Sequence, residues 1–231
     1  MGNIYRAAAP FSGAGASTLP VVPAPLPLPG VVRRWDAETI TVADGTALST
    51  GWVDTANGTT LGVSVGDPRV ETVDGLRAVR FTNDILQQNL TLGQPHTVAL
   101  TFKHISLNTT GTATIFGAQN VIGTDGGIFQ TNTVGDFYAN AGAGFKVGSA
   151  TGTTGWKRVI VTFNGANSVV NLNGTEYTGN TGTLPRAGFS LGGQRTGQFT
   201  DIAVTHASIF PKALTAQERT DLNAWLAGKV A

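Results

Sequence analysis

The sequence contains no cysteine, and this absence excludes several classes of protein. Its 231 residues cannot build a disulfide framework, a thiol nucleophile or a cysteine-ligated zinc site. Charge is also scarce, because only 13% of the residues are charged, about half the usual share. The net charge of +1 is accompanied by no block of either sign, so we expect no binding to nucleic acid.

Long apolar runs are missing as well. No stretch approaches the roughly 18 apolar residues that span a bilayer, so we expect no membrane insertion. Residues 1–30 carry one charge, Arg6, and repeated prolines in place of the unbroken apolar core of a signal peptide. If the protein acts outside a cell, we therefore expect a route other than signal-peptide export.

Proline is concentrated at the start of the chain, where six of the ten prolines precede residue 30. The run over residues 19–29 is locked toward an extended polyproline II conformation and is apolar. Such a segment favours a docking arm over residues 1–30, and a stiff spacer is the alternative. The residues that we expect to contact a partner are Tyr5, Phe11, Pro20, Pro23, Pro25, Pro27 and Pro29.

Residues 31–231 alternate between short apolar runs and turns rich in Gly, Asn and Thr, a pattern typical of an antiparallel β-sandwich. One hairpin is especially clear, because Asn173-Gly174 supplies the positive φ angles of a tight turn between residues 169–172 and 175–178. The other strands that we predict cover residues 77–81, 98–104, 112–117, 159–163, 189–192 and 201–210.

One helix is predicted over residues 215–227. Thr215 and Glu218 have the spacing of a capping box, in which each side chain bonds the other residue's backbone amide. Leu222 and Leu226 then fall on one face together with Trp225, and Gly228 is placed to end the helix.

The segment Gly155-Trp156-Lys157-Arg158-Val159-Ile160-Val161-Thr162-Phe163-Asn164-Gly165 resembles a strand of the laminin-G-like, concanavalin A-like family. Three later segments, 169–174, 191–202 and 209–218, resemble that family's Asn-Gly hairpin, its closing Gly-Gly segment and its run into a short helix, although Thr200 stands where Gly is usual. The resemblance implies an all-β, antiparallel sandwich over residues 31–231. It does not imply one function, because this fold hosts lectins, glycosidases and scaffolds.

The overall design resembles the minor tail and decoration proteins of tailed bacteriophages. The features that carry this resemblance are a short arm, one lectin-like sandwich, and the lack of a signal peptide, cysteine and strong charge. It implies a location on the virion surface, other virion proteins as partners through residues 1–30, and a homo-oligomer.

The sequence does not contain the residue motifs of the catalytic sites that we considered. Retaining glycosidases of this fold place two carboxylates on one strand about 5 Å apart, and none of Glu38, Glu71, Glu176 and Glu218 lies in such a motif. No Gly-x-Ser-x-Gly motif is present, and His96, His104 and His206 are scattered along the sequence. We therefore expect no enzymatic activity.

No cofactor is predicted, and calcium is the one metal that we consider. Calcium needs several oxygen ligands at close spacing, and only Asp125-Gly126-Gly127, Asp67 or Asp74 could begin such a site. The sequence thus offers at most a minor calcium site.

A glycan site is predicted in a loop region between Asp125 and Phe145. Shallow sugar sites combine an aromatic platform with Asn and Asp side chains, and the candidates here are Asp125, Asn132, Asp136, Tyr138 and Asn140. The alternative is that Phe129 and Phe137 belong to the core and that the polar residues stabilise turns.

These observations favour a non-enzymatic virion protein that is anchored by its arm and displays a lectin-like sandwich for adhesion to host glycans. The alternative is a carbohydrate-binding module of a bacterial surface or secreted protein, and a glycosidase is a third possibility.

Overall fold

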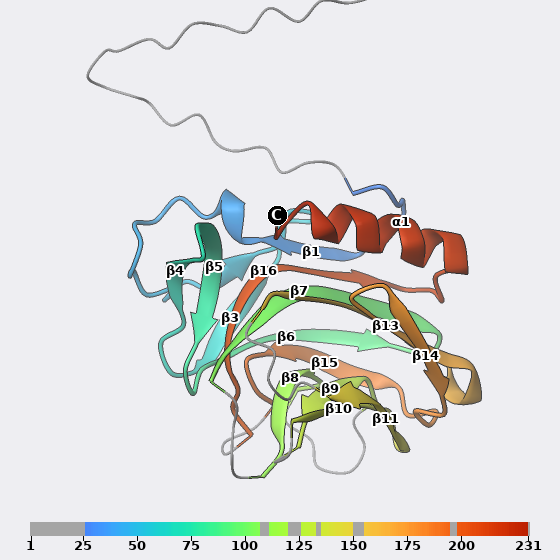
Figure 1. Cartoon of the computed structure of the whole chain (residues 1–231). Coiled ribbons are helices and arrows are strands. Elements are labelled where there is room, and N and C mark those ends of the chain that lie inside the picture. Colours follow the sequence, from blue (N-terminus) through green and yellow to red (C-terminus); the bar gives the residue numbers. More distant parts are fainter. Residues whose placement is uncertain are drawn as a thin grey trace, which may run out of the picture.

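The computed structural model describes residues 26–106, 111–119, 126–132, 135–149, 155–194 and 198–230. Within these ranges the chain forms two antiparallel sheets and one α-helix (Figure 1). The predicted all-β sandwich with a short C-terminal helix is therefore confirmed. None of the described helices is long and apolar enough to cross a membrane.

The first sheet contains eight of the described strands, in the order β14-β13-β12-β7-β16-β5-β4, with β1 also paired to β16. Strand β16 is central because it pairs with β7 on one side and with both β5 and β1 on the other. The bounds of these strands are β1 Arg33–Asp36, β4 Arg69–Val73, β5 Leu76–Phe81, β7 His96–Ser106, β12 Lys157–Phe163, β13 Ser168–Leu172, β14 Thr175–Gly179 and β16 Asp201–Phe210.

The second sheet also contains eight of the described strands, in the order β11-β10-β9-β8-β15-β6-β3-β2. Two short 3-10 helices, η1 Ala37–Thr39 and η2 Gly165–Asn167, lie in connections. The bounds of the strands are β2 Trp52–Val53, β3 Thr60–Val65, β6 Ile85–Leu92, β8 Ala113–Gly117, β9 Ile128–Thr131, β10 Asp136–Asn140, β11 Gly144–Ser149 and β15 Arg186–Leu191.

The core between the sheets is rich in aromatic side chains. Trp35 stacks on Phe189 with ring centroids 5.3 Å apart, and Phe129 stacks on Phe137 at the same distance. Trp52 is also fully buried there, so it is a structural residue like Trp35. Close packing of these rings fixes the separation of the two sheets.

A second apolar cluster lies on the outer face of the first sheet, beneath helix α1 (Ala216–Ala227). Leu222 and Leu226 of the helix pack there against Ala99, Ile160 and Phe210 of the sheet. The predicted capping box is present, since the Thr215 hydroxyl accepts from the Glu218 amide and the Glu218 carboxylate accepts from the Thr215 amide. Gly228 follows the last helical residue with a φ of −66°, so it ends the helix without adopting a left-handed conformation.

The end of the predicted arm joins this cluster. Leu28 is only 7% exposed and packs with Leu26 and Val31 against the helix, whereas Pro27 and Pro29 on either side of Leu28 face the solvent. The chain is thus fixed to the sandwich from residue 26 onward. Tyr5, Phe11, Pro20, Pro23 and Pro25 lie outside the described residues.

Candidate functional site

The predicted glycan residues lie mainly on a strand rather than in the loop that we expected. Asp136, Tyr138 and Asn140 alternate along β10, and the intervening Phe137 and Ala139 are fully buried in the core. Successive side chains of a strand point to opposite faces, so these three residues share the outer face of the second sheet. The alternative reading of Phe137 as a core residue is confirmed, and Asp125 lies outside the described residues.

Two of the predicted polar residues are committed to turns. The Asn132 side-chain oxygen accepts a hydrogen bond from the Asp136 amide at 2.9 Å. The Asn140 side-chain oxygen accepts from the Gly142 amide at 2.8 Å. Both oxygens therefore stabilise local backbone, as Asn side chains commonly do.

Tyr138 lies at the centre of the remaining polar face. It is half-buried and is directly opposite Gln130 of β9 on one side and Lys146 of β11 on the other. The Asp136 carboxylate lies 2.8 Å from the Lys146 amine, and this hydrogen bond raises the pKa of Lys146. The result is a shallow surface with one aromatic ring and several polar groups around it.

The aspartates considered as calcium ligands are engaged in ion pairs. Asp67 lies 2.6 Å from Arg69, and Asp74 lies 2.6 Å from Lys103. Across the described ranges, no group of three or more His, Asp or Glu residues is arranged to hold a metal ion.

A Ser-His-Asp arrangement that the sequence did not reveal lies beneath α1. Nδ1 of His206 donates to the Asp36 carboxylate at 2.9 Å, and Nε2 accepts from the Ser208 hydroxyl at 3.0 Å. Pairing of β1 with β16 brings His206 and Asp36, which are 170 positions apart in the sequence, into contact. All three residues are fully buried, so the Ser208 hydroxyl is closed to any substrate.

Charged side chains around this buried group contact the C-terminal end of α1. Burial raises the pKa of Asp36, but the hydrogen bond from His206 and the charges of Lys229 and Arg34 outweigh it and set the value at about 2. Arg34 and Lys229 also lie over the Trp225 ring, at 5.3 and 4.8 Å from its centroid. Burial lowers the pKa of His206 and keeps its ring neutral. These contacts attach the C-terminal end of α1 to the first sheet. We call the group of Asp36, His206, Ser208, Arg34 and Lys229 the latch.

His96 belongs to a second buried polar cluster, built around Arg186. The Arg186 guanidinium donates to Nε2 of His96 at 3.2 Å and to the Gly117 carbonyl at 2.8 Å, and it is surrounded by phenylalanine rings. Burial and the charge of Arg186 lower the pKa of His96 to about 3. This cluster ties β15 to β7 and β8.

His104 differs from the other two histidines, because both of its ring nitrogens are buried and neither has a hydrogen-bond partner among the described residues. Its ring stacks near Phe137 at 6.0 Å and meets the edge of Phe102 at 5.3 Å. Burial, followed by the charge of Lys157, lowers its pKa to about 4. The structure thus places the His104 ring among aromatic side chains.

Comparison of the fold identifies similar sandwiches among solved structures. Trypanosoma rangeli sialidase in complex with sialic acid superposes with a TM-score of 0.63 at 20% identity, over 91% of this chain and 36% of that chain. The botulinum neurotoxin serotype D binding domain gives 0.58 at 13% identity, over 86% of this chain and 52% of that one. The binding domain of botulinum neurotoxin DC in complex with rat synaptotagmin II gives 0.55 at 12% identity, over 86% and 51%.

This chain thus spans between about one third and one half of the solved chains that it matches. The likeness establishes a β-sandwich of the kind found in these proteins. No family model and no curated protein sequence matches the chain.

Proposed function

We propose that this chain is a non-enzymatic virion component, of the minor tail or decoration type, that displays a lectin-like sandwich for adhesion to host glycans. The binding role is supported by the shared fold, since the matched solved structures include a sialidase in complex with sialic acid and a toxin binding domain. The location on a virion is supported by the resemblance of the sequence to phage tail and decoration proteins.

One observation supports the non-enzymatic part of the proposal: the Asp and Glu side chains of the described residues are engaged in contacts within the protein. Every Asp and Glu within the described ranges has a hydrogen-bond or ion-pair partner in the protein, and several of these contacts join separate elements. The contact of Glu71 with Arg80 is an ion pair at 3.8 Å, without a direct hydrogen bond. Glu176 of β14, for example, makes a two-pronged contact with Arg219 of α1 at 2.7 and 2.9 Å. A retaining glycosidase instead needs two carboxyl groups about 5 Å apart that face a substrate.

The glycan surface that we propose is the outer face of β9, β10 and β11 around Tyr138. The apolar face of a pyranose can lie on an aromatic ring, and its hydroxyls can bond to the adjacent Gln130 and Lys146 side chains. Such a shallow site gives weak binding in a single copy. Several copies on one oligomer would raise the effective affinity through avidity.

A multivalent glycan array tests this surface. Full-length protein, clustered on streptavidin through an N-terminal biotin, should bind a subset of glycans, and Tyr138→Ala should abolish that binding. Gln217→Ala, an exposed change on α1, serves as the matched control and should bind normally. A blank array for the clustered wild-type protein, or unchanged binding by Tyr138→Ala, would refute adhesion through this face.

Hydrolysis of a fluorogenic sialoside tests the non-enzymatic part separately. We expect no release of the fluorophore by the full-length protein above the buffer rate. Steady turnover that persists after repurification would overturn this part of the proposal.

The tether is tested by deletion of residues 1–25. This boundary retains Leu26, Leu28 and Val31, which pack against α1, so the sandwich should remain folded. The truncated protein should fail to join the particle when it replaces the full-length chain during assembly. Normal incorporation of the truncated protein would show that the arm is not the anchor.

A free carbohydrate-binding module of a bacterial surface or secreted protein is the second candidate. It is favoured by the likeness to toxin binding domains, which are modules of larger proteins. This second candidate makes its own prediction: the isolated chain would bind glycans equally well with and without residues 1–25.

A further inference from the structure

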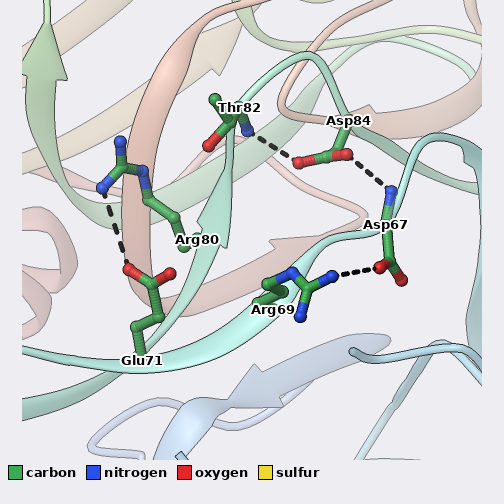
Figure 2. A pocket seen from close by; sticks show the side chains of 6 residues that line it. All are labelled: Asp67, Arg69, Glu71, Arg80, Thr82 and Asp84. Carbon is green, nitrogen blue, oxygen red and sulfur yellow. Dashed lines mark hydrogen bonds and ion pairs between the residues drawn. The ribbon is translucent and has the colours of Figure 1, made fainter. Parts of the chain in front are cut away.

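A polar pocket lies on the outer face of the β4–β5 hairpin (Figure 2). In Figure 1 this hairpin is separate from both α1 and β10, the strand that carries Tyr138. Its volume is about 220 Å³, and its lining consists only of polar residues. The lining residues are Asp67, Arg69, Glu71, Arg80, Thr82 and Asp84.

The register of the hairpin explains why these side chains gather. Val70 and Val79 face each other across the two strands and are fully buried in the core. Their neighbours Arg69, Glu71 and Arg80 must therefore point to the outer face. Arg69 and Arg80 are also direct partners in the register, so both guanidinium groups lie on the same side of the hairpin.

On one side of the pocket, Asp84 joins two backbone segments through hydrogen bonds. Its carboxylate accepts hydrogen bonds from the backbone amides of Asp67 at 2.6 Å and Thr82 at 2.7 Å. Gly66 is required for this closeness, since a Cβ atom there would lie 2.0 Å from an Asp84 oxygen and its φ is +72°. Asp67 in turn fixes the Arg69 guanidinium at 2.6 Å, as Figure 2 shows. A preformed site of this kind loses little freedom when a ligand binds.

On the other side of the pocket, some polar groups make no direct hydrogen bond within the described part of the chain. Two nitrogens of Arg80 are engaged by Asp201, at 2.8 and 2.5 Å. The third, Nη1, lies 3.8 Å from the Glu71 carboxylate, which is too far for a direct hydrogen bond. The Thr82 hydroxyl makes no hydrogen bond within the described part of the chain. A ligand hydroxyl between Arg80 and Glu71 would accept from the guanidinium and donate to the carboxylate.

The charge of the lining restricts the ligand further. Three carboxylates against two guanidinium groups disfavour an anion, and the acidic residues here do not meet the geometry of a metal site in the described structure. A neutral molecule with adjacent hydroxyls fits both restrictions. We propose that this pocket binds one neutral hexopyranose residue of a glycan, with one hydroxyl between Glu71 and Arg80 and another at Thr82. This site stands independently of the Tyr138 face.

Titration of the full-length, ¹⁵N-labelled protein followed by NMR tests the pocket. The probes are methyl α-D-glucopyranoside, methyl α-D-mannopyranoside and methyl β-D-galactopyranoside. At least one should cause saturable shifts of the amides of residues 67–71 and 80–84, with a dissociation constant on the order of 1 mM. Glu71→Ala and Thr82→Val should each weaken this binding about fivefold or more, and Asp221→Ala on α1 should leave it unchanged.

The outcomes separate this proposal from the previous one, because shifts around Tyr138 report the other face. No saturable shift in residues 67–71 and 80–84 with any of the three glycosides would overturn the proposal. So would binding that survives both variants in proteins whose spectra remain those of a folded chain. Stronger shifts of the same amides with N-acetylneuraminic acid or calcium would overturn the neutral ligand class.

Discussion

Substitution of His104 by leucine should remove one defined part of the acid sensitivity of this protein, the part that comes from protonation of His104. The pKa of His104 is lowered from 6.5 to about 4 in the folded state, where its ring is buried among aromatic side chains. Unfolding restores the ordinary value, so below pH 6.5 the unfolded chain binds a proton that the folded chain does not. The contribution to stability is fully present above that pH and is lost as the pH falls toward 4.

The magnitude follows from the two pKa values. At pH 5 the unfolded histidine is almost fully protonated and the folded one is about one-tenth protonated, which corresponds to about 2 kcal/mol less unfolding free energy than at pH 7. The leucine variant loses the proton site and no hydrogen bond, because neither ring nitrogen has a partner. Lys157, whose pKa burial lowers to about 8, stays charged across this interval and adds nothing to the difference.

Urea denaturation at pH 7 and pH 5 measures the effect for both proteins. Wild type contains the contributions of His96 and His206 as well, and these cancel when the pH-dependent losses of the two proteins are subtracted. We expect His104→Leu to lose about 2 kcal/mol less than wild type over this interval. Equal losses in the two proteins would refute the assignment of a neutral, buried His104.

Three further substitutions test the latch, the second apolar cluster beneath α1 and the capping box of α1, each by urea denaturation at pH 7. Asp36→Ala should lower the unfolding free energy by about 3 kcal/mol or more, because His206 and the nearby cations lose their buried partner, whereas the exposed Asp221→Ala should change it by less than about 0.5 kcal/mol. Similar values for the two would contradict the latch. Leu222→Ala should cost about 2–5 kcal/mol, and a loss below 1 kcal/mol would show that α1 is not packed as described. Thr215→Ala should cost about 1 kcal/mol, and no loss would argue against the capping box.

Local sequence signals predicted the local structure well. The Asn173-Gly174 hairpin and the capping box at Thr215 appear where the sequence placed them, because each depends on residues only a few positions apart. The two strands of the hairpin and the helix also match their predicted ranges to within one residue.

Features that depend on distant contacts were harder to predict. The group of Asp36, His206 and Ser208 exists only because β1 pairs with β16, a contact that no local pattern reveals. The segment around Tyr138 was expected to lie in a loop region, yet pairing with β9 and β11 makes it a strand. The sequence analysis did select Asp136, Tyr138 and Asn140 as candidate glycan-binding residues. Their spacing of two residues is the signal that would have placed all three on one face of a strand.

The shared location of Leu26–Val31 and α1 has a practical consequence for binding experiments. Both occupy the outer side of the first sheet, whereas Tyr138 faces outward from β10 of the second sheet. In the protein that lacks residues 1–25, a tag placed directly before Leu26 is therefore joined to the side of the sandwich that carries α1, and not to the side that carries Tyr138. Random amine coupling would instead modify Lys146, next to Tyr138, and could make an active protein look inert.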